Sequence, residues 1–132
     1  MAGILLRDLS RAGHELGRIQ LEDLPERLTL RALLATRIRR EVAAYNAGPG
    51  PVYVGFVQPE DAVRYSDSHR MRRPRRLDAD HFVLAAEQAA EAGLLRFQLG
   101  EQLVSDLDLE VTLAEHAELV AVLERPVVAR DP

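Results

Sequence analysis

The run Leu-Val-Ala-Val-Leu at residues 119–123 constrains the fold most, because it is apolar on both sides when extended. Successive side chains of a strand point to opposite faces, so Val120 and Val122 face one way and the leucines and the alanine face the other. A strand that is apolar on both faces is typical of the middle of a sheet. The sequence therefore predicts a sheet with this segment near its centre.

A hairpin is predicted shortly before that strand. Apolar Leu95, Phe97 and Leu99 alternate with Arg96 and Gln98, which is the pattern of a strand with one buried face. The next two residues, glycine and glutamate, can turn the chain because glycine adopts positive φ without strain. Residues 102–104 can then return as a second, short strand.

The front of the chain predicts another hairpin, followed by a long helix. Apolar residues alternate in residues 3–9 and again around Ile19 and Leu21, with a turn centred on Gly13. Pro25 ends the second strand, and Thr29 is the expected N-cap of a helix that reaches Asn46. The apolar positions of this helix recur every three or four residues, at Leu30, Leu33, Leu34, Ile38, Val42 and Tyr45. The opposite face is expected to carry Arg31, Arg39, Arg40 and Glu41.

The order of these elements resembles the β-grasp fold of ubiquitin and of the small sulfur-carrier proteins. The residues that carry the resemblance in the second half are 99–103, Thr112-Leu113 and 119–123, and the resemblance covers about residues 3–46 and 94–128. It implies an α+β chain, similar to bacterial ubiquitin-like proteins, in which one long helix crosses a mixed sheet. It also implies that the first and last strands lie side by side in the middle of that sheet.

Residues 47–93 depart from the family and are interpreted as a folded insertion within a single domain of residues 1–132. The alternation of Val52, Val54 and Phe56 predicts an extra strand. Pro59 and the acidic residues after it predict a short helix to about Tyr65. Asp78 is expected to cap a second helix over residues 79–92, with a buried stripe at Phe82, Val83, Ala86, Ala89 and Ala90.

The tail lacks the reactive end of the family. Ubiquitin-like modifiers and sulfur carriers end in a pair of glycines, which an adenylating enzyme threads into its active site. When the family's tail is laid on the final strand, Val127 and Val128 occupy those two positions, and no glycine follows Gly100. The resemblance therefore predicts a protein that is not activated or conjugated by the usual route.

Because the resemblance predicts no conjugation, the function that it still implies is binding to another protein. Ubiquitin-like domains usually engage partners through the open face of the sheet, and here that face is expected to carry Arg96, Gln98, Val120 and Val122. The alternative is that the two valines pack under the insertion. The first hypothesis is thus a non-catalytic protein-interaction module with an unidentified protein partner. A diverged component of a bacterial ubiquitin-like or sulfur-carrier system is a variant of it.

A second hypothesis starts from the arginines. Residues 64–76 contain six arginines and one aspartate, although the whole chain has a net charge of −4. Such a stretch predicts an anion site for nucleic acid, an acidic protein or a membrane surface. Tyr65 is the only aromatic residue near this stretch that could stack on a base. The alternative is that these arginines pair with the chain's own acidic residues. The candidate anion-binding residues are Arg70, Arg72, Arg73, Arg75 and Arg76.

Catalysis, cofactors and metals are not expected. The chain has no cysteine, so disulfides, thiolate metal sites and cysteine catalysis are excluded. Residues 66–69 contain the residue types of a hydrolase triad, but neighbours in one loop cannot align as such a triad does. The acids of residues 78–81 suit a helix cap better than a metal site, and residues 106–110 lack the glycine spacing of a calcium loop. With no long apolar run and no secretory pattern at the start, the expected location is the cytoplasm.

Overall fold

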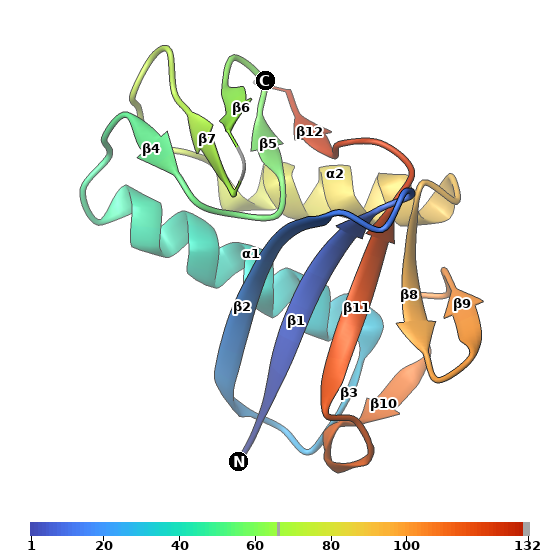
Figure 1. Ribbon diagram of the computed structural model, residues 1–132. Helices are drawn as coiled ribbons and strands as arrows, with labels where there is room; N and C mark the ends of the chain where they lie inside the picture. Colours follow the sequence, from blue (N-terminus) through green and yellow to red (C-terminus); the bar gives the residue numbers. More distant parts are fainter. Residues whose placement is uncertain (66, 131–132) are drawn as a thin grey trace.

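The computed structural model describes residues 1–65 and 67–130, which form an α+β structure around a five-stranded mixed sheet (Figure 1). The strand order is β2-β1-β11-β8-β9. β1 (Ala2–Ser10) and β11 (Glu118–Leu123) are adjacent and parallel, and the other neighbours are antiparallel. The outer strands are β2 (Glu15–Leu24) on one side, and β8 (Leu95–Leu99) with β9 (Gln102–Val104) on the other. The predicted central position of residues 119–123 is confirmed.

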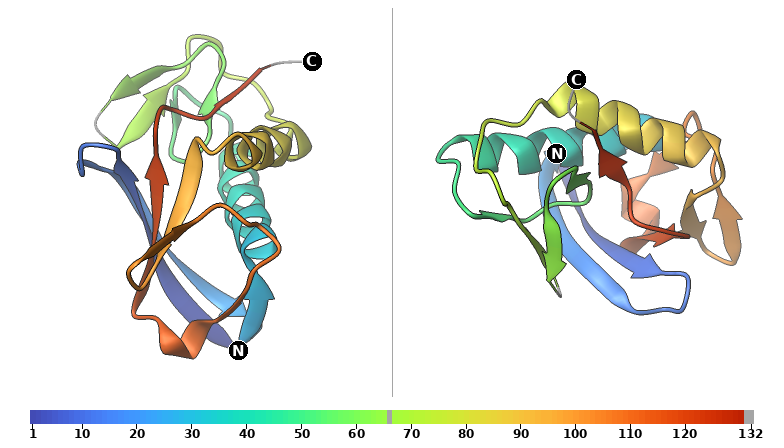
Figure 2. Two further views of the ribbon diagram at one scale, coloured as in Figure 1. Left: turned by 90° about the vertical axis from the view of Figure 1, so that its right-hand side faces the viewer. Right: turned by 90° about the horizontal axis from the view of Figure 1, so that it is seen from above.

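Two helices, α1 (Leu30–Asn46) and α2 (Ala79–Glu91), lie on the same side of this sheet (Figure 2). Both predicted caps are confirmed: the Thr29 side chain accepts a hydrogen bond from the backbone N–H of Ala32, and Asp78 accepts one from Asp80. Every apolar position predicted on α1 is buried. The sheet's other side, called here the open face, carries no helix.

Three smaller sheets complete the structure. β3 (Arg27–Thr29) pairs with β10 (Glu110–Thr112), which is followed by the short 3₁₀ helix η1 (Leu113–Glu115). In the insertion, β4 (Val52–Tyr53), β7 (Ser68–Arg70) and β6 (Val63–Tyr65) form a sheet in that order. β5 (Gln58–Pro59) pairs in parallel with β12 (Val128–Ala129), so the chain's last strand is fastened to the insertion.

The predicted short helix from Pro59 to Tyr65 is wrong. Pro59 lies in β5, and the last three residues of the expected helix form β6. The backbone N–H of Gln58 donates to Val127 O at 2.7 Å, so pairing with a distant segment outweighs the local helix signal. The expected strand around Val52 is also shorter than its alternation suggested, since only Val52 and Tyr53 pair.

The insertion shares the hydrophobic core of the sheet and α1. The Tyr53 ring is fully buried and makes edge-on contacts with Tyr45 of α1, at 5.5 Å between ring centroids, and with Phe82 of α2, at 5.8 Å. One aromatic side chain therefore joins α1 to two parts of the insertion, β4 and α2. The interpretation of residues 47–93 as a folded insertion agrees with this packing.

The Tyr53 ring packs so closely against the backbone of residue 55 that only a glycine fits there. A Cβ atom at residue 55 would lie 2.3 Å from the Tyr53 hydroxyl oxygen, and the buried ring has no room to move away. We expect Gly55→Ala to lower the free energy of unfolding by about 1–3 kcal/mol through overpacking. Gly48→Ala is the matched control, because a Cβ there meets nothing within 4 Å. Urea unfolding of both variants measures the difference, and equal stabilities would contradict this account.

Candidate functional site

The open face brings the four predicted interaction residues together. Val120 of β11 lies opposite Gln98 of β8, and Val122 lies opposite Arg96. Residues directly opposite in neighbouring strands share a face of the sheet. Both valines are half-buried, whereas Leu119, Ala121 and Leu123, which point toward the helices, are buried.

Three leucines that sequence reasoning did not assign extend this surface. Leu9 of β1 is the parallel neighbour of Val122, and Leu103 of β9 lies opposite Gln98 with 48 % of its surface exposed. Arg7, the parallel neighbour of Val120, occupies the next outward position of β1, and Leu5 occupies the one after it. Alternation within residues 3–9 indicated which residues share a side, but their neighbours on β11 depend on the parallel register. The resulting apolar stripe consists of Leu5, Leu9, Leu103, Val120 and Val122.

Charged side chains lie in and beside the stripe and neutralise one another. Arg7 donates from Nε to Glu15 at 2.8 Å and from Nη1 to Glu118 at 2.9 Å, and Arg18 donates to the same Glu15 at 2.7 Å. The hydrogen bonds from Arg18 and then Arg7 lower the pKa of Glu15 to about 2. The charges on this face are therefore balanced, and Arg7 lies within the stripe, beside Val120.

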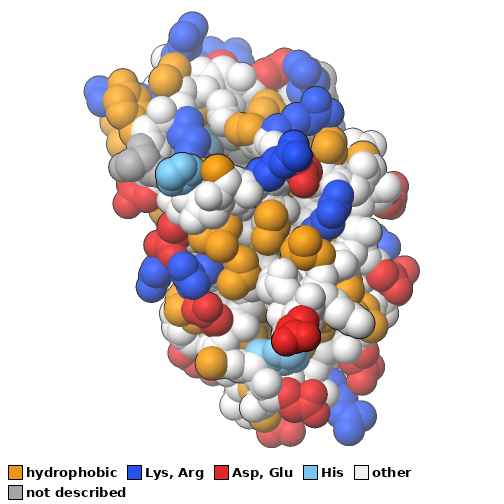
Figure 3. Space-filling view, turned by 45° about the vertical axis from the view of Figure 1, so that its right-hand side comes forward, with side chains coloured by type: hydrophobic (Ala, Val, Ile, Leu, Met, Phe, Trp, Pro, Cys, Tyr) orange, Lys and Arg blue, Asp and Glu red, His pale blue; other side chains and the backbone are white. Residues whose placement is uncertain are grey.

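The insertion does not cover the two valines. It sits at the end of the sheet beyond the β1–β2 turn, and both helices lie on the opposite side (Figure 2). Neither valine belongs to the hydrophobic core or to the partly buried residues packed against it. Figure 3 shows hydrophobic side chains gathered in the middle of the visible surface with charged side chains around them. The alternative in which Val120 and Val122 pack under the insertion is wrong.

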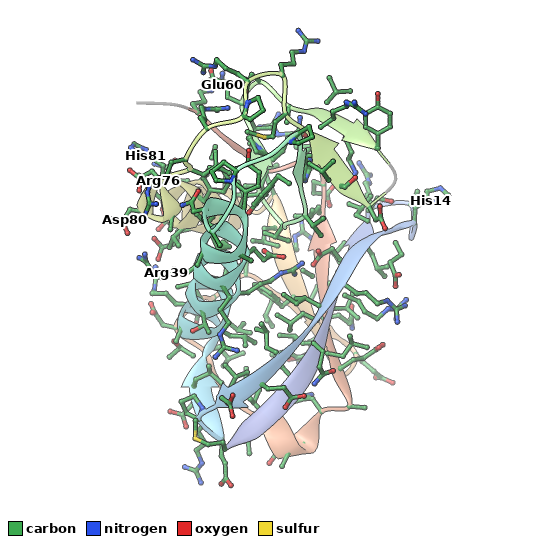
Figure 4. All side chains as sticks on the ribbon, turned by 90° about the vertical axis from the view of Figure 1, so that its left-hand side faces the viewer. His14, Arg39, Glu60, Arg76, Asp80 and His81 are labelled. Atoms are coloured by element: carbon green, nitrogen blue, oxygen red, sulfur yellow. The ribbon has the colours of Figure 1, made fainter. Side chains whose placement is uncertain are left out.

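The arginines of residues 70–76 do not form one site. Asp61 accepts a hydrogen bond from Arg75 at 2.9 Å and lies 3.6 Å from Arg73, which matches the alternative of pairing with the chain's own acids. Arg70 lies on β7, and Arg72 is exposed in the following bend. Arg76 lies instead near the start of α2, with Arg39, Asp80 and His81 (Figure 4). The five candidates are thus divided among separate parts of the surface.

A cleft of about 310 Å³ between the β1–β2 hairpin and the insertion contains a buried charge cluster that the sequence did not reveal. The Arg37 guanidinium donates from both Nη atoms to the Asp8 carboxylate at 2.5 and 2.6 Å, and its Nε lies 3.4 Å from Glu41. The other oxygen of Glu41 accepts the backbone N–H of Phe56 at 3.1 Å, and Arg37 lies over the Phe56 ring. Asp8, Arg37 and Glu41 are each less than 10 % exposed. The assignment of Glu41 to the exposed face of α1 is therefore wrong.

The cluster holds two carboxylates for one guanidinium, and this imbalance affects protonation. Burial raises the pKa of Glu41, and the opposing attraction of Arg37 does not cancel that effect. Burial alone would lower the pKa of Arg37, but Glu41 and Asp8 outweigh it and raise the pKa. Arg37 thus remains charged, and the proton affinity of Glu41 is higher than that of an exposed glutamate.

A pH dependence of stability follows from Glu41. Since its pKa is higher in the folded than in the unfolded chain, its contribution to stability is complete below the ordinary value of 4.5 and is lost as the pH rises through the folded pKa. Glu41→Gln keeps an oxygen for the Phe56 N–H and removes the titration. We expect wild type to lose stability relative to this variant as the pH rises from about 4 to neutrality. Urea unfolding at a series of pH values measures this, and a difference that stays constant would contradict it.

The residues considered for catalysis have structural roles or lie outside the described residues. Ser66 is not described, and His69 is buried with Nε2 3.1 Å from Gly55 O and a pKa lowered by burial. Asp78 caps α2, and Asp106 accepts the backbone N–H of Asp108. Among the described residues, no group of three histidines or carboxylates is placed to hold a metal ion. None of the described helices has the length and apolar character needed to cross a membrane.

Val127 and Val128, the residues that the resemblance aligned with a diglycine, lie just before and at the start of β12. Val127 is buried and its carbonyl accepts the N–H of Gln58, while Val128 pairs with Gln58 as the first residue of β12. Ala129, the next residue, is also buried. These residues are thus held against the insertion.

Three comparisons with known proteins bear on identity. The chain matches no family model, no curated protein and no solved structure. A functional interpretation therefore depends on the surfaces and contacts described above.

Proposed function

We propose that this protein is a non-catalytic, ubiquitin-like interaction module that binds another protein through the open face of its five-stranded sheet. The observation that carries the proposal is the uncovered apolar stripe centred on Val120 and Val122. Apolar side chains together with an arginine, here Arg7 beside Val120, are a usual composition of a protein–protein interface, in which arginine is enriched. The side chains of Arg96 and Gln98 border the two valines and would set the specificity of the contact.

The topology supports the ubiquitin-like part of the proposal. The first and last strands of the five-stranded sheet are parallel neighbours at its centre, and α1 crosses one face, as the resemblance implies. The second helix and the small sheets of the insertion are additions to that plan. They lie on the helix side and at one end, so the face used for binding in such proteins is left free.

The tail supports binding rather than conjugation. An adenylating enzyme needs a thin, flexible terminus, but Val127 and Val128 carry branched side chains and are engaged with β5. Releasing them would expose Val127 and Ala129, which are buried. A module that is recognised without being attached agrees with both features.

Site-directed photo-cross-linking tests the proposal in the cells that make the protein. A photoreactive residue replaces Gln98 on the open face, and the matched control replaces Leu84, which is 50 % exposed on α2. We expect a discrete adduct from residue 98 that is absent from residue 84. Identical adducts from both sites, or none from residue 98, would contradict binding through the open face.

A further inference from the structure

The outer face of the β4-β7-β6 sheet forms a second exposed apolar surface. Val52, Arg70 and Val63 lie opposite one another across the three strands, so their side chains share a face. The neighbouring row on the other face contains the buried Tyr53 and His69, so the first row points outward. Tyr65, two residues after Val63, falls on the outer face as well.

This surface is unusually apolar for an exposed one. Val52 is 50 % exposed, Val63 41 % and Tyr65 55 %, and Val54, two residues beyond Val52, is 63 % exposed. These four and Arg70 are called here the insertion patch. Arg70 makes no ion pair with any described residue. Exposed apolar side chains gathered in one place mark interaction surfaces, and tyrosine and arginine are enriched there.

The opposite end of the molecule carries the complementary charge. Residues 101–118 contain no lysine or arginine and six acids, all exposed. Asp108, Glu110 and Glu118 pair with arginines of the same chain, whereas Glu101, Asp106 and Glu115 make no ion pair with any described residue. The six acids follow the turn after β8 and surround β10 and η1, at the end of the sheet where β1 begins (Figure 1). Exposed Leu109 adds an apolar side chain to this acidic end. In Figure 3, basic side chains gather at the top of the molecule and acidic ones toward the bottom.

We propose that the insertion patch binds the acidic end of a second copy of this chain, so that molecules associate head to tail. Both surfaces combine exposed apolar side chains with charge: Arg70 is the charged residue of the patch, and the unpaired acids Glu101, Asp106 and Glu115 give the other end the opposite sign. Because two different surfaces meet, the contact is heterologous and leaves one free patch and one free acidic end, to which further copies can add. This role is separate from partner binding at the open face.

A second copy fits the patch better than nucleic acid does. The patch offers a single aromatic ring for stacking and three valines, which contact apolar side chains and not phosphates. Arg73 and Arg75, which flank the patch in sequence, are engaged with Asp61. An acidic surface that includes an exposed leucine would match both the arginine and the apolar side chains of the patch. The acidic end of this chain, with Leu109, is such a surface.

Sedimentation velocity of the full chain tests the association. Between about 0.01 M and about 1 M salt, the screening length falls from about 30 Å to about 3 Å, so we expect assembly that grows with protein concentration at low salt and dissociates at high salt. A chain that sediments as a monomer at every concentration would overturn the proposal. So would assembly that salt does not weaken, or an oligonucleotide that binds the patch of a monomeric protein.

Two end-specific variants make the test sharper. Tyr65→Ser with Arg70→Ser removes the ring and the charge from the patch, and Glu101→Arg with Glu115→Arg reverses the charge of the acidic end, so the two altered surfaces do not attract each other; all four side chains are exposed. Each variant alone should raise the dissociation constant about tenfold or more. Mixed in equal amounts, the two should form a dimer and nothing larger, because only one intact pair of surfaces remains. Far-UV circular dichroism checks that each is folded, and assembly by either variant alone at wild-type strength would overturn the proposal.

Discussion

Arg37→Met is expected to destabilise the protein by about 3–5 kcal/mol, which is the usual cost of removing one partner from a buried ion pair. The substitution keeps most of the side-chain volume but leaves Asp8 and Glu41 buried without their counter-charge. It also removes the guanidinium from the Phe56 ring. Urea unfolding at neutral pH measures the effect directly.

Arg39→Met is the matched control for that substitution. Arg39 lies on the same helix and pairs with Asp80 at 2.9 Å, but both side chains are more than half exposed. An exposed pair contributes about 0–1 kcal/mol, so this variant should remain close to wild type. If both variants lost a similar amount of free energy of unfolding, the burial of the Arg37 cluster would not explain its contribution to stability.

Replacing Val120 and Val122 together by aspartate should abolish partner binding while the protein stays folded. The two carboxylates would remain hydrated in the free protein, but they would lose that water against an apolar partner surface. Central interface residues cost about 2 kcal/mol or more when altered, which is a loss of affinity of about thirtyfold or more. The measurement is the yield of the adduct formed from residue 98.

The control for this double variant is Leu84→Asp, at an exposed position on α2. That variant should form the adduct as wild type does, and both should unfold at nearly the same urea concentration. Global unfolding of the double valine variant would show instead that these side chains are part of the packed interior, and the open-face site would then have to be abandoned.

The elements that follow local rules could be predicted from the sequence. Thr29 and Asp78 precede periodic apolar residues and cap the helices as expected. Gly100 adopts positive φ at the predicted turn between β8 and β9. The side-chain alternation of β8 and β11 also indicated which residues face away from the helices, so Arg96, Gln98, Val120 and Val122 could be predicted to share one face.

What escaped prediction depends on contacts between distant segments. β5 and β12 have two residues each, which is too short for any periodic signal in the sequence. They are strands only because they pair with each other. Arg37 and Glu41 are four residues apart, a spacing that usually indicates a surface ion pair. Their burial follows from Asp8 on β1 and from the loop at Phe56, neither of which helix periodicity can report.

The parallel pairing of β1 with β11 has a consequence for biosynthesis. Leu5 meets Glu118, so the first strand to leave the ribosome must wait for the last strand of its sheet. At about 5–20 residues per second, the early hairpin waits several seconds with the apolar side of Ile4, Leu6 and Leu21 uncovered. Closing so long a loop is also entropically slow. The sheet of a nascent chain of this kind is therefore completed only when translation reaches β11.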